Sequence, residues 1–261
     1  MFPKIKSIVF LLAGIVTIAA GIYWCFRIPT YYPLWPKLGL EKIALAINPN
    51  DPGLQFAIGD YYFGRGAYDV TQAKKYFQAT IALDERYPRA HYQLSRTYFI
   101  RGNLNQALKE IDRELELYPD FKRSYYIRGL TYGYRKELEK AAADFEEFLK
   151  WKPESWAGHN DLAWIYFQMG DYEKVLRTTE EGLQYTPLNA WLLNSQGVAL
   201  LNLGRKEEAR LAFEKALPIA MSMTVADWGR SYPGNNPEIY PQGLASMRES
   251  IKKNLELLAP R

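Results

Sequence analysis

Small residues recur along this chain at a nearly constant interval. Counting back from Gly197, the interval is 34 residues three times and 36 residues once, with these landmarks: Ala163, Gly129, Ser95 and Gly59. An aromatic residue or a leucine follows each landmark by three positions: Tyr62, Tyr98, Tyr132, Tyr166 and Leu200. A fixed period in this range is the signature of stacked supersecondary units, each of which buries its apolar face against its neighbours. We therefore expect a linear array of similar units.

Within each period the spacing predicts two helices joined by a tight turn. In the second helix a small or branched residue precedes a partner by four positions, which places both on one buried face. The pairs are Ala73 and Phe77, Ala107 and Ile111, Ala141 and Phe145, Val175 and Thr179, and Ala209 and Phe213. Four glycines stand where the first helix ends and suit the left-handed conformation of a helix C-terminus: Gly66, Gly102, Gly170 and Gly204. Lys136 replaces this glycine in the third copy, so we expect a strained or differently shaped turn there.

Antiparallel helix pairs with this period and this pattern of small, aromatic, glycine, alanine and proline positions resemble the tetratricopeptide repeat (TPR) family. The resemblance covers about residues 36–221, with a half repeat at 38–51 and five units in 52–223. Glu85, Glu114 and Met221 depart from the family pattern. The resemblance implies an all-α, right-handed superhelical solenoid. It also implies a scaffold for protein–protein interaction, although the repeat serves many unrelated systems.

An apolar segment precedes the repeats. Residues 8–26, which follow a basic N-terminus at 1–7, carry no charge. As a helix they would be about 28 Å long, which matches a bilayer core of about 30 Å. We predict an uncleaved transmembrane helix, with a cleaved signal peptide as the alternative. Lys4 and Lys6 lie on one side and only Arg27 lies close on the other, which favours a cytoplasmic N-terminus and extracytoplasmic, periplasmic or equivalent, repeats.

Two further features bear on the membrane. Residues 27–37 are rich in proline and aromatic residues, which predicts a stiff, extended linker with Tyr31, Tyr32 and Trp35 at the lipid headgroups. Within the apolar segment, spacings of three and four bring small residues to one face, which permits close contact with another helix in lipid. These residues are Ala13, Thr17, Ala20 and Gly21.

Charge and residue types argue against several function classes. The chain has 33 basic and 29 acidic residues, a net charge of +4, and +1 when Lys4, Lys6 and Arg27 are set aside. That balance provides no basic stripe for nucleic acid. His91 and His159 are two repeats apart, too far for a shared metal site. We predict no metal, no cofactor and no small-molecule substrate, and we expect that the chain is not an enzyme.

The predicted binding surface is the concave side of the solenoid, formed mainly by the first helix of each unit. Aromatic and Arg side chains are enriched at binding hot spots, and Asn pairs with a peptide backbone through both its donor and its acceptor. The candidate residues are Phe56, Asp60, Arg89, Tyr92, Arg96, Arg123, Tyr126, Tyr134, Asn160, Trp164, Phe167, Trp191 and Asn194. The alternative for each aromatic residue is that it packs between adjacent repeats. Some family members grip a C-terminal carboxylate with Lys and Asn, but Tyr92 and Tyr126 stand where that clamp would need polar groups.

The C-terminal part loses the period. Residues 224–242 are rich in Gly, Pro and Asn and predict a loop, which either docks into the groove or meets a partner. An apolar stripe in 243–259 predicts a helix that caps the last repeat. We expect a membrane-tethered scaffold that binds a peptide or a helix as an adaptor in assembly, secretion or quality control. The alternative is a permanent accessory subunit of an integral membrane complex.

Overall fold

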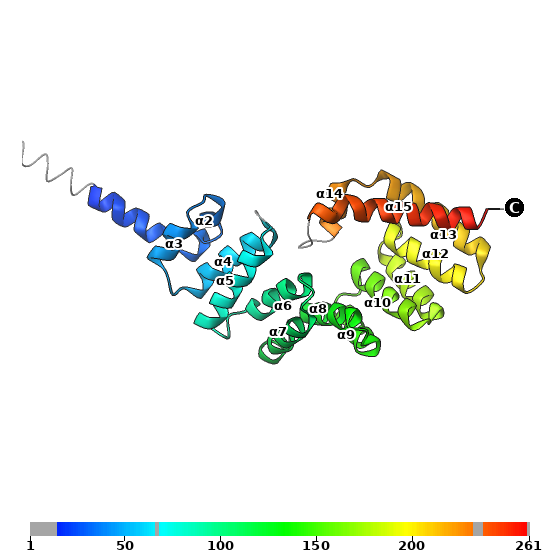
Figure 1. Ribbon diagram of the computed structural model, residues 1–261, viewed down its shortest axis with the longest axis horizontal. Coiled ribbons are helices and arrows are strands. Elements are labelled where there is room, and N and C mark those ends of the chain that lie inside the picture. Colours follow the sequence, from blue (N-terminus) through cyan, green and yellow to red (C-terminus); the bar gives the residue numbers. More distant parts are fainter. Residues whose placement is uncertain (1–14, 66–67, 232–236, 260–261) are drawn as a thin grey trace, which may run out of the picture. The chain divides into compact units, whose positions relative to one another are not determined.

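The computed structural model describes residues 15–65, 68–231 and 237–259 (Figure 1). Every regular element in these ranges is a helix. The chain divides into two compact units, Met1–Thr97 and Tyr98–Arg261, and the boundary falls within one helix. The predicted all-α class is confirmed.

The described part of unit 1 begins with a helix at residues 15–25 and leads through short helical turns into the first helix pair. Its further elements are η1 (Pro29–Tyr31), α2 (Leu34–Lys37), α3 (Glu41–Ile47), α4 (Pro52–Asp60), η2 (Tyr61–Arg65), α5 (Val70–Leu83) and α6 (Ala90–Ile100). Helices α4 and α5 pack against each other around the buried ring of Phe77. A Cβ atom on Gly59 would lie 2.7 Å from that ring, so the packing leaves no room for a side chain at this landmark position.

The segment predicted as an extended linker is folded against the first repeat instead. Tyr32 and Trp35 are buried, and the Trp35 ring stacks on Phe26 with centroids 4.3 Å apart. Asn48 Nδ2 donates to the backbone oxygen of Phe26 at 2.8 Å, which ties the end of helix 15–25 to the turn after α3. The placement of Tyr32 and Trp35 at the lipid headgroups was therefore wrong, whereas Tyr31 remains 39% exposed.

A single carboxylate organises this packing. Asp51 Oδ2 accepts a hydrogen bond from the Tyr32 hydroxyl at 2.5 Å, while its Oδ1 accepts from the Leu54 N–H at 3.0 Å and caps α4. Burial and the Asp51 carboxylate raise the pKa of Tyr32. The proline spacing suggested extension, but proline also fits the first turn of a helix, as Pro29 does in η1.

Unit 2 consists of helix pairs that follow one another along the chain (Figure 1). Its elements are α7 (Leu104–Leu117), α8 (Arg123–Tyr134), α9 (Leu138–Trp151), α10 (Trp156–Met169), α11 (Tyr172–Tyr185), α12 (Ala190–Asn202), α13 (Lys206–Ser222), α14 (Val225–Ser231), η3 (Pro237–Ile239) and α15 (Tyr240–Leu257). Helices α8, α10 and α12 each pack on the second helix of their own pair and on that of the preceding pair. Fully buried Phe145, Ile165 and Phe213 lie in the resulting continuous core.

The turns within the pairs follow the glycine pattern. Gly102, Gly170 and Gly204 have φ of 72°, 77° and 77°, the left-handed conformation that glycine adopts without penalty. Lys136 has φ of 64°, so it adopts the same conformation with a Cβ atom present. The expectation of a strained turn at Lys136 is confirmed. Gly66 lies outside the described residues, and Gly64 has φ of 154° just before it.

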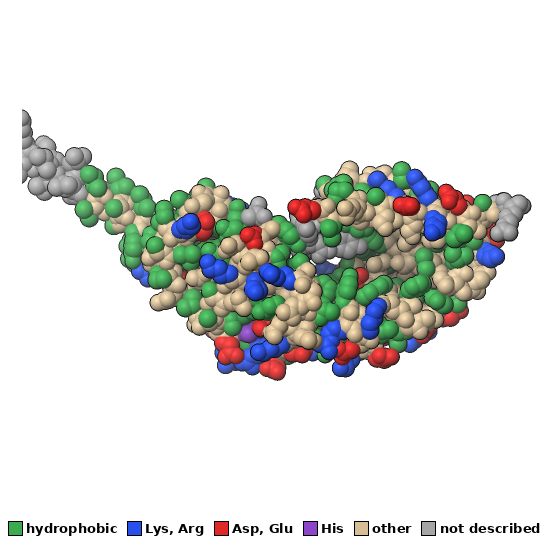
Figure 2. All heavy atoms as spheres, viewed as in Figure 1, with side chains coloured by type: hydrophobic (Ala, Val, Ile, Leu, Met, Phe, Trp, Pro, Cys, Tyr) green, Lys and Arg blue, Asp and Glu red, His purple; other side chains and the backbone are tan. Residues whose placement is uncertain are grey.

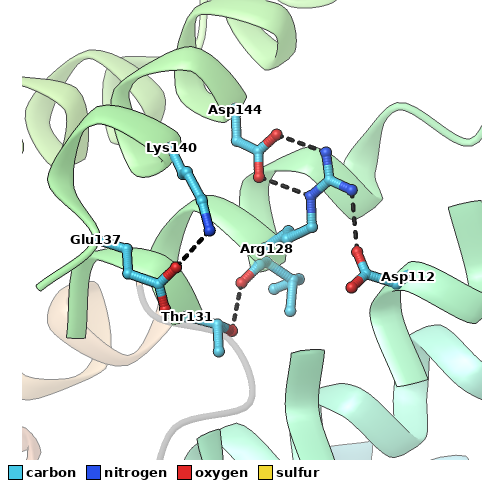
Figure 3. A network of polar contacts seen from close by, with 7 residues as sticks. Asp112, Arg128, Thr131, Glu137, Lys140 and Asp144 are labelled. Carbon is cyan, nitrogen blue, oxygen red and sulfur yellow. Dashed lines mark hydrogen bonds and ion pairs between the residues drawn. The ribbon is translucent and has the colours of Figure 1, made fainter. Parts of the chain in front are cut away.

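A charged network joins two successive pairs in unit 2 (Figure 3). Arg128 on α8 donates from Nε and Nη2 to the two oxygens of Asp144 on α9, both at 2.8 Å. Its Nη1 donates to Asp112 Oδ1 on α7 at 3.0 Å. The Asp144 side chain is only 8% exposed, which leaves Arg128 as the group that compensates a buried charge.

The C-terminal part is more helical than predicted, since α14, η3 and the start of α15 all lie within 224–242. Thr224 and Asp227 cap the start of α14 reciprocally: Asp227 Oδ2 accepts from the N–H and hydroxyl of Thr224, both at 2.7 Å, and Thr224 Oγ1 accepts from the Asp227 N–H at 3.2 Å. A capping helix is present as α15, which packs on α13 through buried Leu244, Met247 and Ile251. Glycine and proline content predicted a loop, but Thr224 and Asp227 cap α14, and Pro241 fits the first turn of α15.

The predicted transmembrane segment lies partly outside the described residues, since description begins at residue 15. Residues 15–25 are helical, and hydrophobic side chains lie exposed along them (Figure 2). Among the described residues, no helix is both long enough and apolar enough to span a bilayer.

Candidate protein-binding surface

In unit 1, the candidate residues are tied to one another. The Arg89 guanidinium lies 5.5 Å from the Phe56 ring, and Phe56 in turn packs against Phe77 and Tyr87. Phe56 therefore contributes partly to packing, which was the alternative to a binding role for each aromatic residue. The exposed side chain of Arg89 covers its ring. Arg89 also has a positive φ of 68°, an unusual backbone conformation for a side chain of this kind.

The second group in unit 1 centres on Arg96. Its guanidinium lies 4.5 Å from the Phe63 ring and 5.7 Å from the Tyr92 ring. Gln93 links it to the first pair, because Gln93 Oε1 accepts from Arg96 at 2.9 Å and Gln93 Nε2 donates to Asp60 at 2.5 Å. Asp60, Tyr92 and Arg96 thus form one cluster across α4, η2 and α6.

In unit 2, aromatic side chains touch from one first helix to the next. The Tyr134 ring on α8 lies 5.3 Å from the Trp164 ring on α10 and 5.4 Å from the Phe99 ring. Tyr134 is 59% exposed and Phe167 is 40% exposed, whereas Trp164 is half-buried. Gly133 allows this contact, since a Cβ atom there would lie 2.8 Å from the Trp164 ring. These rings form a partly exposed aromatic row, defined as Phe99, Tyr134 and Trp164.

A polar row runs beside the aromatic one. The Tyr126 hydroxyl donates to Asp161 Oδ2 at 2.5 Å, and the Ser195 hydroxyl donates to Asn160 Oδ1 at 3.1 Å. Tyr126 also packs edge-on against Phe145, with centroids 5.6 Å apart, so its ring belongs to the inter-repeat packing. Asn194 carries a buried Oδ1 without a hydrogen-bond partner among the described residues.

Asp161 is the member of this row that sequence reasoning missed. Both hydrogen bonds join residues 35 positions apart, an offset that the repeat length of 34 residues does not by itself specify. One repeat plus one residue thus brings side chains on successive first helices together, and that rule pairs Tyr126 with Asp161. Burial raises the pKa of Asp161 to about 6, against the opposing effect of hydrogen bonds from Tyr126 and Asn160.

Trp191 is less available than predicted. Its ring stacks on Trp156 at 4.8 Å and contacts Trp228 of α14 at 5.4 Å. The segment predicted as a loop therefore docks on a candidate groove residue within unit 2.

Another candidate residue, Arg123 at the start of α8, is exposed.

The two histidines are buried, whereas the described small residues of the apolar segment are exposed. His91 and His159 are both buried, and His159 Nε2 lies 2.8 Å from the Pro153 carbonyl oxygen. No group of metal-ligating side chains occurs within the described ranges. Of the small residues proposed for contact in lipid, Thr17, Ala20 and Gly21 are exposed, and Ala13 lies outside the described residues.

These features define an all-α solenoid protein built from helix-turn-helix repeats, with partly exposed aromatic and polar side chains on its first helices. Two sequence profiles of the tetratricopeptide repeat family match residues 56–120 with 175–224, and 122–155. Together they cover more than half of the chain, which therefore belongs to this family. Members of the family are generally scaffolds for protein interaction rather than enzymes.

Relatives of known sequence or structure agree with the fold. The TPR repeat-containing protein YpiA of Bacillus subtilis is 27% identical over 178 residues, which are 67% of this chain. This chain spans only about two-fifths of the length of YpiA, since the match covers 41% of that protein.

Solved structures with a similar backbone include two of MamA and one of YrrB. MamA from Desulfovibrio magneticus RS-1, residues 41 to the end, has a TM-score of 0.60 at 18% identity, covering 66% of this chain and 96% of that one. Another MamA crystal structure has a TM-score of 0.58 at 21% identity, covering 69% and 94%. YrrB, described as a TPR protein with an unusual peptide-binding site, has a TM-score of 0.57 at 14% identity, covering 70% and 93%.

Proposed function

We propose that this protein is a membrane-tethered scaffold that binds a peptide or a helix of a partner protein along its first helices and acts as an adaptor in assembly, secretion or quality control. The observation that carries the proposal is the aromatic row of unit 2. Aromatic side chains that keep exposed surface on a rigid repeat array provide large contact area at low entropic cost, as binding hot spots do.

The packing behind the row supports a preformed site. Trp164 contacts the Tyr134 ring and packs against the core, and Ile165 beside it is fully buried. A surface held in this way needs little rearrangement when a partner binds, which favours affinity. The similarity in fold to YrrB, described as carrying a peptide-binding site, agrees with this proposal.

The membrane tether rests on residues 8–26. The described part of this segment is a helix on which Ile15, Val16 and Ile18 are 54%, 66% and 65% exposed. Exposed aliphatic side chains in an uninterrupted run are favourable in lipid and unfavourable in water. In this proposal the N-terminus is cytoplasmic and the repeats are extracytoplasmic, and folding of residues 26–37 onto the first repeat keeps the repeats close to the bilayer.

A second candidate, an accessory subunit of an integral membrane complex, is favoured by the small residues of the same helix. Thr17, Ala20 and Gly21 are exposed, and they permit close approach of another membrane helix. In that case the partner is recognised mainly within the bilayer, and the repeats hold an extrinsic component.

The experiment is to extract the full-length chain in mild detergent and to identify the proteins that co-purify with it. One variant carries Tyr134→Ala and Trp164→Ala, and a second has residues 8–26 replaced by an unrelated membrane span. The matched control is Trp151→Ala with Tyr185→Ala, exposed aromatic residues of the second helices α9 and α11.

The adaptor function predicts that partners are lost with the first variant and retained with the control. Loss only with the replaced span would support the accessory-subunit function. A partner set that is the same in all four preparations would contradict both. A C-terminal reporter active only in the cytoplasm would contradict the proposed orientation.

A further inference from the structure

We infer that unit 2 recognises a cationic side chain, lysine or arginine, of the bound peptide, with Asp161 as its charge partner and the aromatic row beside it. This inference rests on the proposed function and specifies the chemistry of the partner. Two features support it: the hydrogen-bond partners of the Asp161 carboxylate, and the position of Trp164 on the same face of α10.

The carboxylate of Asp161 is held by neutral groups only. The Tyr126 hydroxyl donates to Oδ2 at 2.5 Å, and the side chain of Asn160 provides the other hydrogen bond. No lysine or arginine of the described chain forms an ion pair with Asp161. The protein therefore surrounds a partly desolvated anion without supplying its counter-charge, an arrangement that costs free energy.

Asp161 is partly buried. The residue keeps part of its surface exposed to solvent, while burial dominates the surroundings of its carboxyl group. Neither hydrogen-bond donor carries a charge, so an incoming cation meets no competitor at this carboxylate. A lysine or arginine would supply a charged donor, so that both partners of the hydrogen bond carry a charge.

The aromatic row lies on the same side of α10. Trp164 follows Asp161 by three residues, which places the two side chains on one helix face. The Tyr134 ring contacts Trp164 and is itself 59% exposed. Ring faces attract cations, most strongly those of tryptophan, so a lysine or arginine at Asp161 gains a second favourable contact.

The neighbouring helix adds hydrogen-bond acceptors. Ser195 on α12 already donates to Asn160, and Asn194 beside it has a buried Oδ1 without a partner. Backbone N–H groups of a peptide or the remaining donors of a guanidinium match such an acceptor. An anionic ligand does not fit, because the Asp161 carboxylate would repel it.

The test uses the full-length chain in detergent and a displayed library of random nine-residue peptides. The inference predicts that selected peptides are enriched in lysine or arginine at one position. The best such peptide is then measured by isothermal titration beside its analogue, with citrulline in place of arginine or acetyl-lysine in place of lysine. We expect at least a tenfold loss of affinity for the neutral analogue.

The key variant is Asp161→Asn, which keeps an acceptor for Tyr126 and removes the charge. It is expected to bind the charged and the neutral peptide within about threefold of each other. Glu154→Gln is the matched control, since Glu154 is an exposed carboxylate in the turn before α10, and it should keep the tenfold preference. The circular dichroism spectrum of each variant verifies that it is folded.

Two results would overturn the inference. Selected peptides without cationic enrichment, or a charge preference that Asp161→Asn leaves unchanged, would leave the peptide-binding function standing and remove the role of Asp161. Selection of no peptide at all would instead overturn the proposed function together with the inference.

Discussion

The guanidinium of Arg128 lies side-on to the carboxylate of Asp144, and two parallel hydrogen bonds of 2.8 Å join them (Figure 3). The Arg128 side chain is 23% exposed and the Asp144 side chain 8%. Burial raises the pKa of Asp144, and the adjacent Arg128 acts against this change. The pair and Asp112 connect three helices of successive repeats.

Replacing Arg128 by Met should destabilise the protein strongly, because Asp144 would remain buried without its counter-charge. We expect a loss of about 2–4 kcal/mol in the free energy of unfolding. Urea unfolding followed by circular dichroism measures it as a lower midpoint. Adding Asp144→Leu should restore part of the loss; a double variant less stable than Arg128→Met would contradict this account.

Replacing Lys136 by Gly should stabilise the protein, because the residue has a positive φ of 64°. Removing the Cβ atom relieves about 1 kcal/mol of backbone strain, partly offset by the greater freedom of glycine in the unfolded chain. The control is Lys136→Ala, which removes the side-chain contact to Gln168 but keeps the Cβ atom. A gain in melting temperature with Ala as large as with Gly would show that the side chain, and not the backbone, is responsible.

Two landmark glycines should respond differently to alanine. A Cβ atom on Gly197 would lie 2.6 Å from the fully buried ring of Phe213, so Gly197→Ala should cost about 1–3 kcal/mol. At Gly129 the nearest atom, the Ala141 carbonyl oxygen, is 3.3 Å away. The gain in helix propensity of about 1 kcal/mol then offsets much of the contact. Thermal unfolding of both variants tests the order, and equal losses would refute it.

Replacing Asp161 by Asn should stabilise the protein at neutral pH. The pKa of Asp161 is raised to about 6, so the folded protein binds a proton more readily than the unfolded chain. Ionisation of this group therefore costs stability above pH 6, and the cost disappears as the pH falls towards 4. We expect Asp161→Asn to be about 1–2 kcal/mol more stable at pH 7.5, with the difference between the two proteins shrinking at pH 4.5.

Denaturant unfolding of both proteins at the two pH values measures this difference. A variant that is less stable at pH 7.5 would show that the carboxylate contributes favourably to the fold. The same substitution is expected to weaken the preference for a cationic peptide. Asp161 would then be a residue at which stability and binding are opposed.

Much of the repeat architecture follows from local patterns. Helix pairs were predicted from the interval of 34 residues, the turn glycines and the alanine–aromatic pairs. The strained backbone at Lys136 was predicted because this residue replaces the glycine of the other copies. The period of a helix indicates which of its faces is exposed, and on that basis Tyr134 and Trp164 were expected in the groove; Tyr134 is exposed, whereas Trp164 is half-buried.

Contacts between elements required the tertiary structure. The accessibility of Trp191 to a partner depends on α14, because Trp228 of that helix, 37 positions later in the chain, contacts the Trp191 ring. The folding of Tyr32 and Trp35 onto the first repeat depended on Asp51, 19 residues after Tyr32.

The sequence by itself determined the repeat, its helices and its turns, because these depend on interactions within a few residues and on a pattern present in five copies. Only the tertiary structure decided that Asp161 meets Tyr126 and no cation. That relation arises from two helices whose facing side chains are one repeat plus one residue apart. A single-residue rotation of either helix would bring different groups together, and hydrophobic periodicity does not specify a helix face to that precision.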